Sequence, residues 1–301
     1  MNSVLSLQIT IFGLIAAGFL VKKIGLISQQ GQKSITDLVI YVILPCNIFK
    51  AFLNGNAGES LASYSAVLLI SLGIQIFSVI YGKLVFRHET ESRRKCLEYA
   101  TICSNSGFLG NPVAEGMYGA EGLVIASIYL IPLRIMMWSS GLPIFTGTHN
   151  YKDTLRRVLT HPCILACMAG ILFMLTGWRL PGSVMGIVSA LGSCNTAMSM
   201  LVIGMILANL RISALWDKTV LIYCLHRLIL IPGLVFLACR FLSLSDMIKG
   251  LCVMLAAMPA GATTSILAEK YQMEPEFGTK LVIVSTLLSL PTLFIWILLL
   301  A

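Results

Sequence analysis

Long apolar runs dominate this chain and alternate with short polar stretches from one end to the other. A helix that crosses a bilayer needs about 20 mostly apolar residues. Windows of this length predict ten membrane-spanning helices. The predicted spans are 4–21, 35–53, 61–86, 96–119, 121–145, 160–178, 183–208, 218–241, 248–271 and 278–300. The predicted fold class is therefore an all-α integral membrane protein.

Two of the predicted spans are interrupted near their middles. The first contains Ser104-Asn105-Ser106-Gly107-Phe108-Leu109-Gly110-Asn111-Pro112, and the second contains Ala256-Ala257-Met258-Pro259-Ala260-Gly261-Ala262-Thr263-Thr264. Gly relaxes the backbone and Pro removes an N–H group, so both segments should break the helix. A break inside the membrane is tolerated only where protein or a watery cavity surrounds it. Paired broken helices are typical of transporter binding sites.

Other prolines lie inside predicted spans, where each is a candidate for a helix kink. They are Pro45, Pro132, Pro143, Pro232 and Pro291.

The ten spans divide into two sets of five. We predict a first repeat over 1–145, a basic cytoplasmic connector over 146–159, and a second repeat over 160–301. Because five is odd, the second repeat would enter the membrane from the opposite side, as in many secondary transporters. The broken spans would then cross near the middle of the bilayer. Aligning Asn105 with Pro259 also aligns Gly107 with Gly261.

Composition and charge agree with a membrane protein. Hydrophobic residues make up 57% of the chain and charged residues only 11%, against about 25% charged in soluble domains. The net charge of +8 does not indicate nucleic acid, because the positions of Lys and Arg explain it. Most lie in or beside the odd-numbered loops, whereas the even loops have only Lys50, Arg179, Arg240 and Lys249. The positive-inside rule therefore predicts cytoplasmic odd loops and both termini outside.

Several classes of site find no support in the sequence. The N-terminal residues lack the basic region of a signal peptide, so we expect the first apolar run to be retained. The nine cysteines form no CxxC pair, and we expect them to be small packing residues. The chain has no P-loop, no HExxH and no pair of intramembrane carboxylates. We expect no cofactor, no metal site and no enzyme activity.

The chain resembles the auxin efflux carrier family, which includes the plant PIN auxin exporters and bacterial carriers for malonate or malate. The similar segments are Leu44-Pro45, residues 105–112 of the first interruption, residues 258–271 from the second interruption onward, Leu201-Val202-Ile203-Gly204, and Arg227 with Ile231-Pro232. The resemblance covers essentially the whole chain. It implies a homodimer in a bacterial inner membrane, with spans 1, 2, 6 and 7 as a scaffold and spans 3–5 and 8–10 as a moving transport domain. Where the family often has a second proline in span 7, this chain reads Asn195-Thr196-Ala197.

Polar residues at the breaks are the candidates for substrate binding. The amide of Asn105 can donate and accept hydrogen bonds without carrying charge, so it suits either a substrate carboxylate or freed backbone groups. Pro112 and Pro259 would shape the crossing and expose half-helix N-termini, which favour anions. Ser104, Gly107 and Gly261 complete this set. The hydroxyls of Ser106, Thr263 and Thr264 are candidates for ion coupling, although no intramembrane carboxylate accompanies them.

Two arginines lie within predicted spans. Placing Arg in mid-membrane costs at least about 2.5 kcal/mol, so such a residue is a functional candidate by default. The guanidinium of Arg134 suits a carboxylate. Arg227 is nearer the cytoplasmic end of its span, and its alternatives are ion coupling or pairing with helix-end carbonyls. Asn47 and Asn195 would line the site from the scaffold side, or else join helices by hydrogen bonds.

These features predict a secondary transporter of a small organic anion, working within the lipid bilayer by an elevator-like movement of the crossing helices. The alternative is a membrane sensor that binds a ligand in the same pocket without transporting it. No loop is long enough to form a signalling domain, which favours the transporter.

Overall fold

The structure is a computed structural model that describes residues 2–54, 61–147, 151–208 and 217–300. Within these ranges the chain is helical, without strands, and has one isolated antiparallel bridge between Ser104 and Ala260. Six described helical stretches are long and apolar enough to cross a membrane, or seven if one bent pair counts as a span. The six are 29–54, 63–85, 106–146, 182–208, 218–239 and 275–300. The protein is therefore a multi-pass membrane protein.

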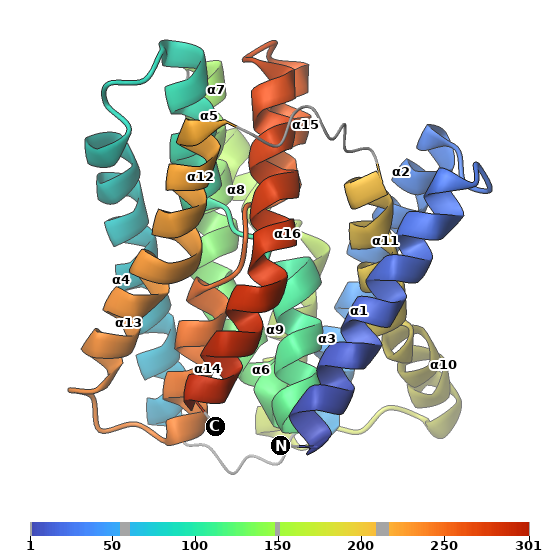
Figure 1. Ribbon diagram of the computed structural model, residues 1–301. Helices are drawn as coiled ribbons and strands as arrows, with labels where there is room; N and C mark the ends of the chain where they lie inside the picture. The colour runs from blue at the N-terminus through green and yellow to red at the C-terminus, as the bar shows by residue number, and fades with distance from the viewer. Residues whose placement is uncertain (1, 55–60, 148–150, 209–216, 301) are drawn as a thin grey trace. The chain divides into compact units, whose positions relative to one another are not determined.

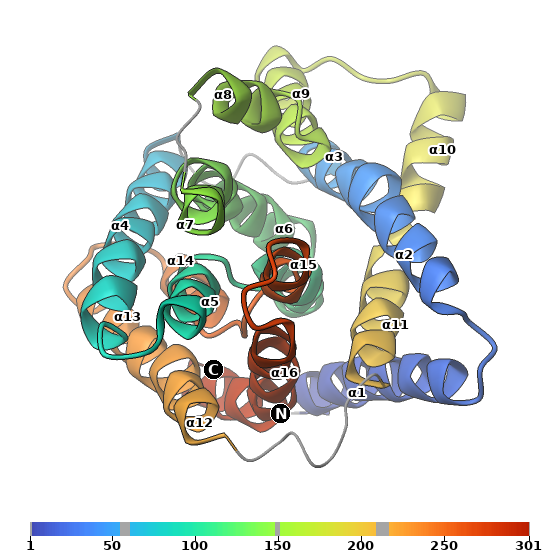
Figure 2. The same ribbon diagram turned by 90° about the horizontal axis from the view of Figure 1, so that it is seen from above.

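The chain forms two compact units, each built from segments distant in sequence. Unit 1 comprises Met1–Tyr64, Asn111–Ile128 and Leu159–Asn209. Besides the first part of α6, its helices are α1 (Asn2–Lys23), α2 (Gln29–Leu38), α3 (Leu44–Asn54), α9 (Pro162–Thr176), α10 (Gly182–Ser193) and α11 (Asn195–Ala208). In Figure 1, α1 and α11 run side by side, and Figure 2 shows α3 next to α9.

Small residues bring α1 and α11 into close backbone contact. A Cβ atom on Gly204 would lie only 2.7 Å from the backbone nitrogen of Phe19, and one on Gly18 would lie 2.7 Å from Leu201 Cα. Lipid tails are as apolar as the side chains, so helices in a membrane associate chiefly through such close packing. These glycines therefore set the distance between the two helices.

Unit 2 comprises Ser65–Gly110, Tyr129–Val158 and Leu210–Ala301. Its helices, wholly or for the most part, are α4 (Leu61–Val85), α5 (Glu91–Ile102), α7 (Leu142–Thr146), α8 (Tyr151–Leu159), α12 (Lys218–Leu225), α13 (Ile231–Cys239), α14 (Asp246–Ala256), α15 (Thr263–Lys270) and α16 (Pro275–Leu300). Helix α6 (Asn111–Met136) contributes its last part. Gly119 interrupts α6 with φ 62° and ψ −149°, a conformation that glycine adopts without steric cost.

Four prolines are each preceded by a π-helical turn. The turns are η1 (Val39–Ile43), η2 (Ser106–Gly110), η3 (Met137–Gly141) and η5 (His226–Leu230), and they come just before Pro45, Pro112, Pro143 and Pro232. Proline has no N–H group, and its ring clashes with the carbonyl four residues earlier. A π-turn moves the hydrogen bonds to the fifth residue, as in the bond from the Ile231 amide to the His226 carbonyl.

One carbonyl freed by a proline has a partner from another helix. The carbonyl of Leu228, four residues before Pro232, accepts a 2.8 Å hydrogen bond from the indole Nε1 of Trp296 on α16.

Three of the five predicted kink positions come just after a π-turn, namely Pro45, Pro143 and Pro232. Pro132 and Pro291 instead lie inside the α-helices α6 and α16.

Several helix boundaries differ from the predicted spans, and two of the differences bear on the site and the connector. Residues 151–159 of the predicted connector form the helix α8, which the sequence analysis did not anticipate. The span predicted at 96–119 begins as a helix already at Glu91, and its helix resumes at Ser106, before Pro112. Pro112 therefore lies in the first turn of α6 within a continuing helix. Residues 148–150 of the connector and the loop containing Arg211 lie outside the described residues.

Candidate functional site

The two interrupted segments pair with each other inside unit 2. Helix α5 ends at Ile102 and α14 ends at Ala256. Beyond these ends, the Asn105 amide donates to the Pro259 carbonyl at 2.8 Å, and the Gly261 amide donates to the Cys103 carbonyl at 2.8 Å. Helix ends in a membrane leave backbone groups without intrahelical partners. The paired breaks, which we define as Cys103–Asn105 and Pro259–Gly261, satisfy some of these groups mutually.

The pairing depends on a glycine. A Cβ atom on Gly261 would lie 2.9 Å from the Cys103 carbonyl oxygen and 3.3 Å from that of Ser104. No side chain fits at this position without separating the paired breaks. Gly107 is different, because a Cβ atom there would meet nothing within 4 Å. Gly107 therefore borders open space.

Arg227 bridges the two chain segments that lead into the paired breaks. Its side chain is only 3% exposed. Its Nε donates to the Met258 carbonyl at 2.9 Å and its Nη1 to the Thr101 carbonyl at 3.1 Å. These carbonyls belong to the C-terminal ends of α14 and α5, where a cation is favourable. Of the alternatives considered for Arg227, this geometry favours pairing with helix-end carbonyls.

The hydroxyl groups near the breaks differ in their hydrogen bonding. Ser104 and Ser106 lie 2.7 Å apart through their Oγ atoms, and Ser106 also donates to the Leu255 carbonyl at 3.0 Å. The Oγ1 of Thr264 is buried and has no partner in the described residues. Thr263 is the first residue of α15. Among Ser104, Ser106 and Thr264, the hydroxyl of Thr264 is the one without a described partner.

The side chain of Asn105 lies at the paired breaks and is 6% exposed. The backbone of Asn105 is fully used, since its amide donates to Pro259 and its carbonyl accepts from the Leu109 amide at 3.0 Å. Its side-chain amide forms no hydrogen bond with another described residue. The amide is therefore free to bind a ligand.

Arg134 lies in the part of α6 that belongs to unit 2 and is 5% exposed. Its Nη1 is buried without a hydrogen-bond partner among the described residues. Leaving a buried polar atom of a charged group without a partner is unfavourable, so the unpaired Nη1 of Arg134 is unusual in a native structure. No described hydrogen bond or ion pair joins Arg134 to the paired breaks.

Three buried asparagines in unit 1 also have side-chain polar atoms without a hydrogen-bond partner among the described residues. The Nδ2 of Asn47 donates to the Glu115 carboxylate at 2.9 Å, whereas its Oδ1 has no partner among the described residues. The Oδ1 of Asn195 accepts from Ser199 at 3.3 Å, and its Nδ2 is unpaired within the same residues. Neither side-chain polar atom of the buried Asn111 has a described partner. Asn47 and Asn195 were predicted as scaffold-side candidates.

Comparison with known proteins identifies the family. A family model described as "Membrane transport protein" matches residues 3–154 and 148–297. The chain belongs to this family. It is 22% identical to an uncharacterized transporter of Methanocaldococcus jannaschii, with 94% of each chain covered. It is 21% identical to a Rhizobium meliloti protein named "Putative malonate transporter", covering 97% of this chain and 94% of that one.

A plant relative extends the comparison. The chain is 26% identical to auxin efflux carrier component 8 of Arabidopsis thaliana over 142 residues, which is 46% of this chain and 39% of the plant protein. The resemblance to auxin efflux carriers, read from the interrupted segments, is thus confirmed. The residues around the breaks accordingly belong to a membrane transporter.

Sequence reasoning missed two residues near the predicted site, Asn111 and Glu115. Asn111 is part of the first interrupted segment, but only its burial and its unpaired amide distinguish it. Glu115 follows the first interrupted segment in the sequence and is the partner of Asn47. Gln32, Gln75 and Trp138 also have buried unpaired atoms among the described residues, and they lie outside the predicted site. An unpaired atom alone therefore does not identify a site residue.

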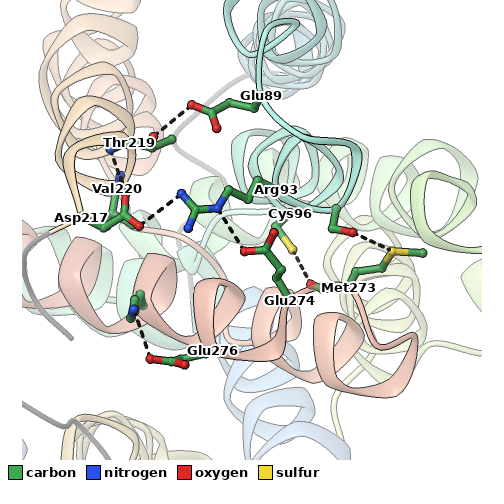
Figure 3. Close-up of polar contacts among 11 residues, drawn as sticks. Glu89, Arg93, Cys96, Asp217, Thr219, Val220, Met273, Glu274 and Glu276 are labelled. Atoms are coloured by element: carbon green, nitrogen blue, oxygen red, sulfur yellow. Dashed lines mark hydrogen bonds and ion pairs between the residues drawn. The ribbon is translucent and has the colours of Figure 1, made fainter. Parts of the chain in front are cut away.

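A separate cluster of ion pairs in unit 2 links the start of α5 with the segments that precede α12 and α16 (Figure 3). Arg93 pairs with Asp217 at 3.3 Å and Glu274 at 3.0 Å, and its guanidinium lies 4.6 Å from the centroid of the Phe277 ring. Burial disfavours the charged form, but the hydrogen bond to Glu274 and the charge of Asp217 outweigh it and raise the pKa of Arg93. Arg93 thus joins the start of α5 to the segments preceding α12 and α16.

Proposed function

We propose that this protein is a secondary active carrier of a small organic anion. Its membership of a membrane transport family supports the transporter class. The observation that supports an anionic substrate is the buried guanidinium of Arg134, whose Nη1 has no partner in the described chain. A guanidinium binds a carboxylate bidentately. The relative named for malonate is consistent with this substrate class.

The paired breaks supply the second element of the proposal. The side-chain amide of Asn105 and the hydroxyl of Thr264 both belong to unit 2 and have no described hydrogen-bond partner. The helix resumes at Ser106, and α15 begins at Thr263. Both helix N-termini favour negative charge. In this proposal Ser104, Gly107, Gly261 and these N-termini surround the carboxylate, while Pro259 holds the break open.

We propose an elevator-like movement as the mechanism, in an inverted repeat of ten spans. The grouping of α1, α2, α3, α9, α10 and α11 into unit 1 supports a scaffold made from spans 1, 2, 6 and 7. Unit 2 would then be the moving body. The division is not the predicted one throughout, because the first part of α6 belongs to unit 1. We further propose a homodimer formed by the scaffold.

The driving force in this proposal is the proton gradient or the membrane potential. We propose a bacterial inner membrane, with the odd-numbered loops in the cytoplasm and both termini outside. Reporter fusions at the two ends test this orientation. An active cytoplasmic reporter at either end would contradict it.

The anion proposal is tested with the purified protein by thermal shift and by uptake in proteoliposomes. Malonate, malate and an indole carboxylate are the probes, each with and without sodium, and malonamide is the neutral control. A ligand that binds the folded state raises the melting temperature. We expect a carboxylate to do so and malonamide not to. Equal protection by malonamide, or protection by none of the acids, would overturn the anion assignment.

Matched variants then locate the site. We expect Arg134→Gln to abolish uptake and ligand protection, and Arg134→Lys to retain a small part of both. Asn105→Ala should lose uptake while remaining folded. Arg240→Gln, at an exposed arginine, is the control for loss of charge. If Arg134→Gln transports normally, Arg134 is a structural residue.

A further inference from the structure

A basic cavity of about 300 Å³ lies in unit 2 between α4, α5 and the segment formed by η3 and α7. Its lining contains three cationic side chains, Lys83, Arg94 and Lys95, and one carboxylate, that of Glu98. With ordinary ionisation, the lining has a net charge of plus two. The hydroxyl-bearing Ser140 also lines the cavity. This composition suits an anion with several acceptor oxygens.

The ion pairs of the described residues do not neutralise all of the positive charge that lines the cavity. Arg94 Nε lies 3.6 Å from Glu98 Oε1, and Lys95 Nζ lies 2.9 Å from Glu91 Oε1. Glu91 is largely exposed to solvent, so its attraction for Lys95 is screened. Lys83 forms no ion pair with another residue of the described chain.

A second cavity in unit 2 lies between α4 and α6. It measures about 210 Å³ and is entirely apolar in its lining, with Leu68, Leu69 and Leu72 from α4 and Ile131, Pro132, Ile135 and Met136 from α6. Leu72 precedes Lys83 by about three helical turns, or roughly 16 Å at 1.5 Å per residue. Half the hydrocarbon core of a bilayer is about 15 Å thick. The distance between the two cavities along α4 is therefore close to the distance from a phospholipid headgroup to the end of its acyl chains at the bilayer midplane.

An apolar surface connects the two cavities along α4. The exposed side chains of Leu69, Leu72, Ile76 and Ile80 follow one another at helical spacing. Figure 2 shows α4 next to α5 and α7, the helices that contribute to the basic cavity. We call the basic cavity, the exposed apolar side chains of α4 and the apolar cavity together the groove. One end of the groove is cationic, and the rest of it is apolar.

We propose that this groove binds an anionic phospholipid. The phosphate occupies the basic cavity, where Lys83 and Arg94 donate to its oxygens, and one acyl chain follows α4 to the apolar cavity. The predicted cytoplasmic position of Lys83–Lys95 matches the anionic cytoplasmic leaflet. The groove shares no residue with the proposed substrate site, and its lipid does not depend on the transported anion.

The test measures lipid binding to the purified full chain by native mass spectrometry. Phosphatidylglycerol and phosphatidylcholine with identical acyl chains are titrated in parallel. We expect phosphatidylglycerol to bind at least tenfold more tightly. Each cation contributes about 1 kcal/mol to binding an anionic lipid surface, equivalent to about fivefold. The double variant Lys83→Gln/Arg94→Gln should therefore weaken phosphatidylglycerol about 25-fold and leave phosphatidylcholine unchanged.

The control is Lys280→Gln. Lys280 pairs with Glu276 at 3.1 Å in unit 2, is not among the residues that line either cavity, and is predicted to be cytoplasmic like Lys83. It should leave lipid binding unchanged. Equal binding of the two lipids, or equal loss in the control, overturns the proposal.

Two further variants test each end of the groove separately. Ser140→Asp adds a negative charge to the basic cavity without removing a cation, so it tests the headgroup even if the double variant does not fold. Leu72→Trp fills the apolar cavity and should weaken phosphatidylglycerol at least fivefold. Glycerol 1-phosphate is the soluble probe. If it displaces phosphatidylglycerol at equal concentration and Leu72→Trp has no effect, the cavity binds a soluble phosphate, and the lipid proposal is wrong.

Discussion

The amide nitrogen of Asn47 lies 2.9 Å from a carboxylate oxygen of Glu115, although the two residues are 68 positions apart in the chain. The bond joins α3 to α6 within unit 1. Asn47 is fully buried, so the bond forms where water competes little.

The first prediction concerns this pair. Glu115→Ala should lower stability by about 1–3 kcal/mol, because it leaves the buried amide of Asn47 without an acceptor. Glu115→Gln should cost less, since its side-chain carbonyl can still accept. A double-mutant cycle with Asn47→Ala, measured by chemical unfolding in detergent, should give a coupling of at least about 0.5 kcal/mol. Additive effects of the two single variants would contradict the contact.

The second prediction concerns Arg227. Arg227→Ala removes the donor to the Thr101 and Met258 carbonyls, and hydrogen bonds to charged groups are worth about 1.5–3 kcal/mol each. We expect a clear fall in melting temperature together with loss of uptake. Arg227→Lys should be intermediate, because an ammonium lacks the fork that reaches two acceptors. Arg240→Ala, at an exposed position, is the control. An unchanged melting temperature for Arg227→Ala would refute this role.

The third prediction tests the paired breaks. Gly261→Ala places a methyl group 2.9 Å from the Cys103 carbonyl oxygen, so the segments must separate. Overpacking of this kind costs about 1–3 kcal/mol. We expect lower thermal stability and loss of uptake. Gly233→Ala is the matched control, because its methyl group would meet only the end of Trp296 at 3.9 Å. Similar behaviour of the two variants would argue against a tight pairing.

The fourth prediction concerns the α1–α11 contact. Gly204→Ala should lower the melting temperature, because its methyl group has no room against the backbone of Ile15 and Phe19. Gly13→Ala on α1 should be neutral, since nothing lies within 4 Å of the added atom. Both are measured by differential scanning fluorimetry. A neutral Gly204→Ala would mean that the helices separate at little cost.

The sequence predicted the second break because its cause is local: Pro259 cannot continue the preceding helix, and α14 ends at Ala256. The first break was placed less well, because α5 ends at Ile102 whereas Gly107, Gly110 and Pro112 lie in the helix that resumes at Ser106. The π-turns were only partly predicted. A proline indicates that a helix must adjust, but it does not determine whether the adjustment is a kink or an added residue in the preceding turn.

The contacts of the site could not be predicted in the same way. Arg227 and Met258 are 31 residues apart, and only the pairing of the breaks brings the Thr101 carbonyl to the same guanidinium. The sequence identified Arg134 as a buried charge, but not that its Nη1 lacks a partner. The helix α8 was missed because four of its nine residues are charged, although Leu155 and Leu159 lie on one face.

The position of Arg227 also determines the charge balance at the breaks. The C-terminal end of a helix carries about half a negative charge, so the ends of α5 and α14 together carry about one. The guanidinium between them carries one positive charge. This group of backbone and side chain is therefore close to electroneutral and offers an anion no net attraction. Attraction for a carboxylate must therefore come from other groups, such as the helix N-termini at Ser106 and Thr263 or the guanidinium of Arg134. Replacing Arg227 with a neutral residue would leave a local excess of negative potential.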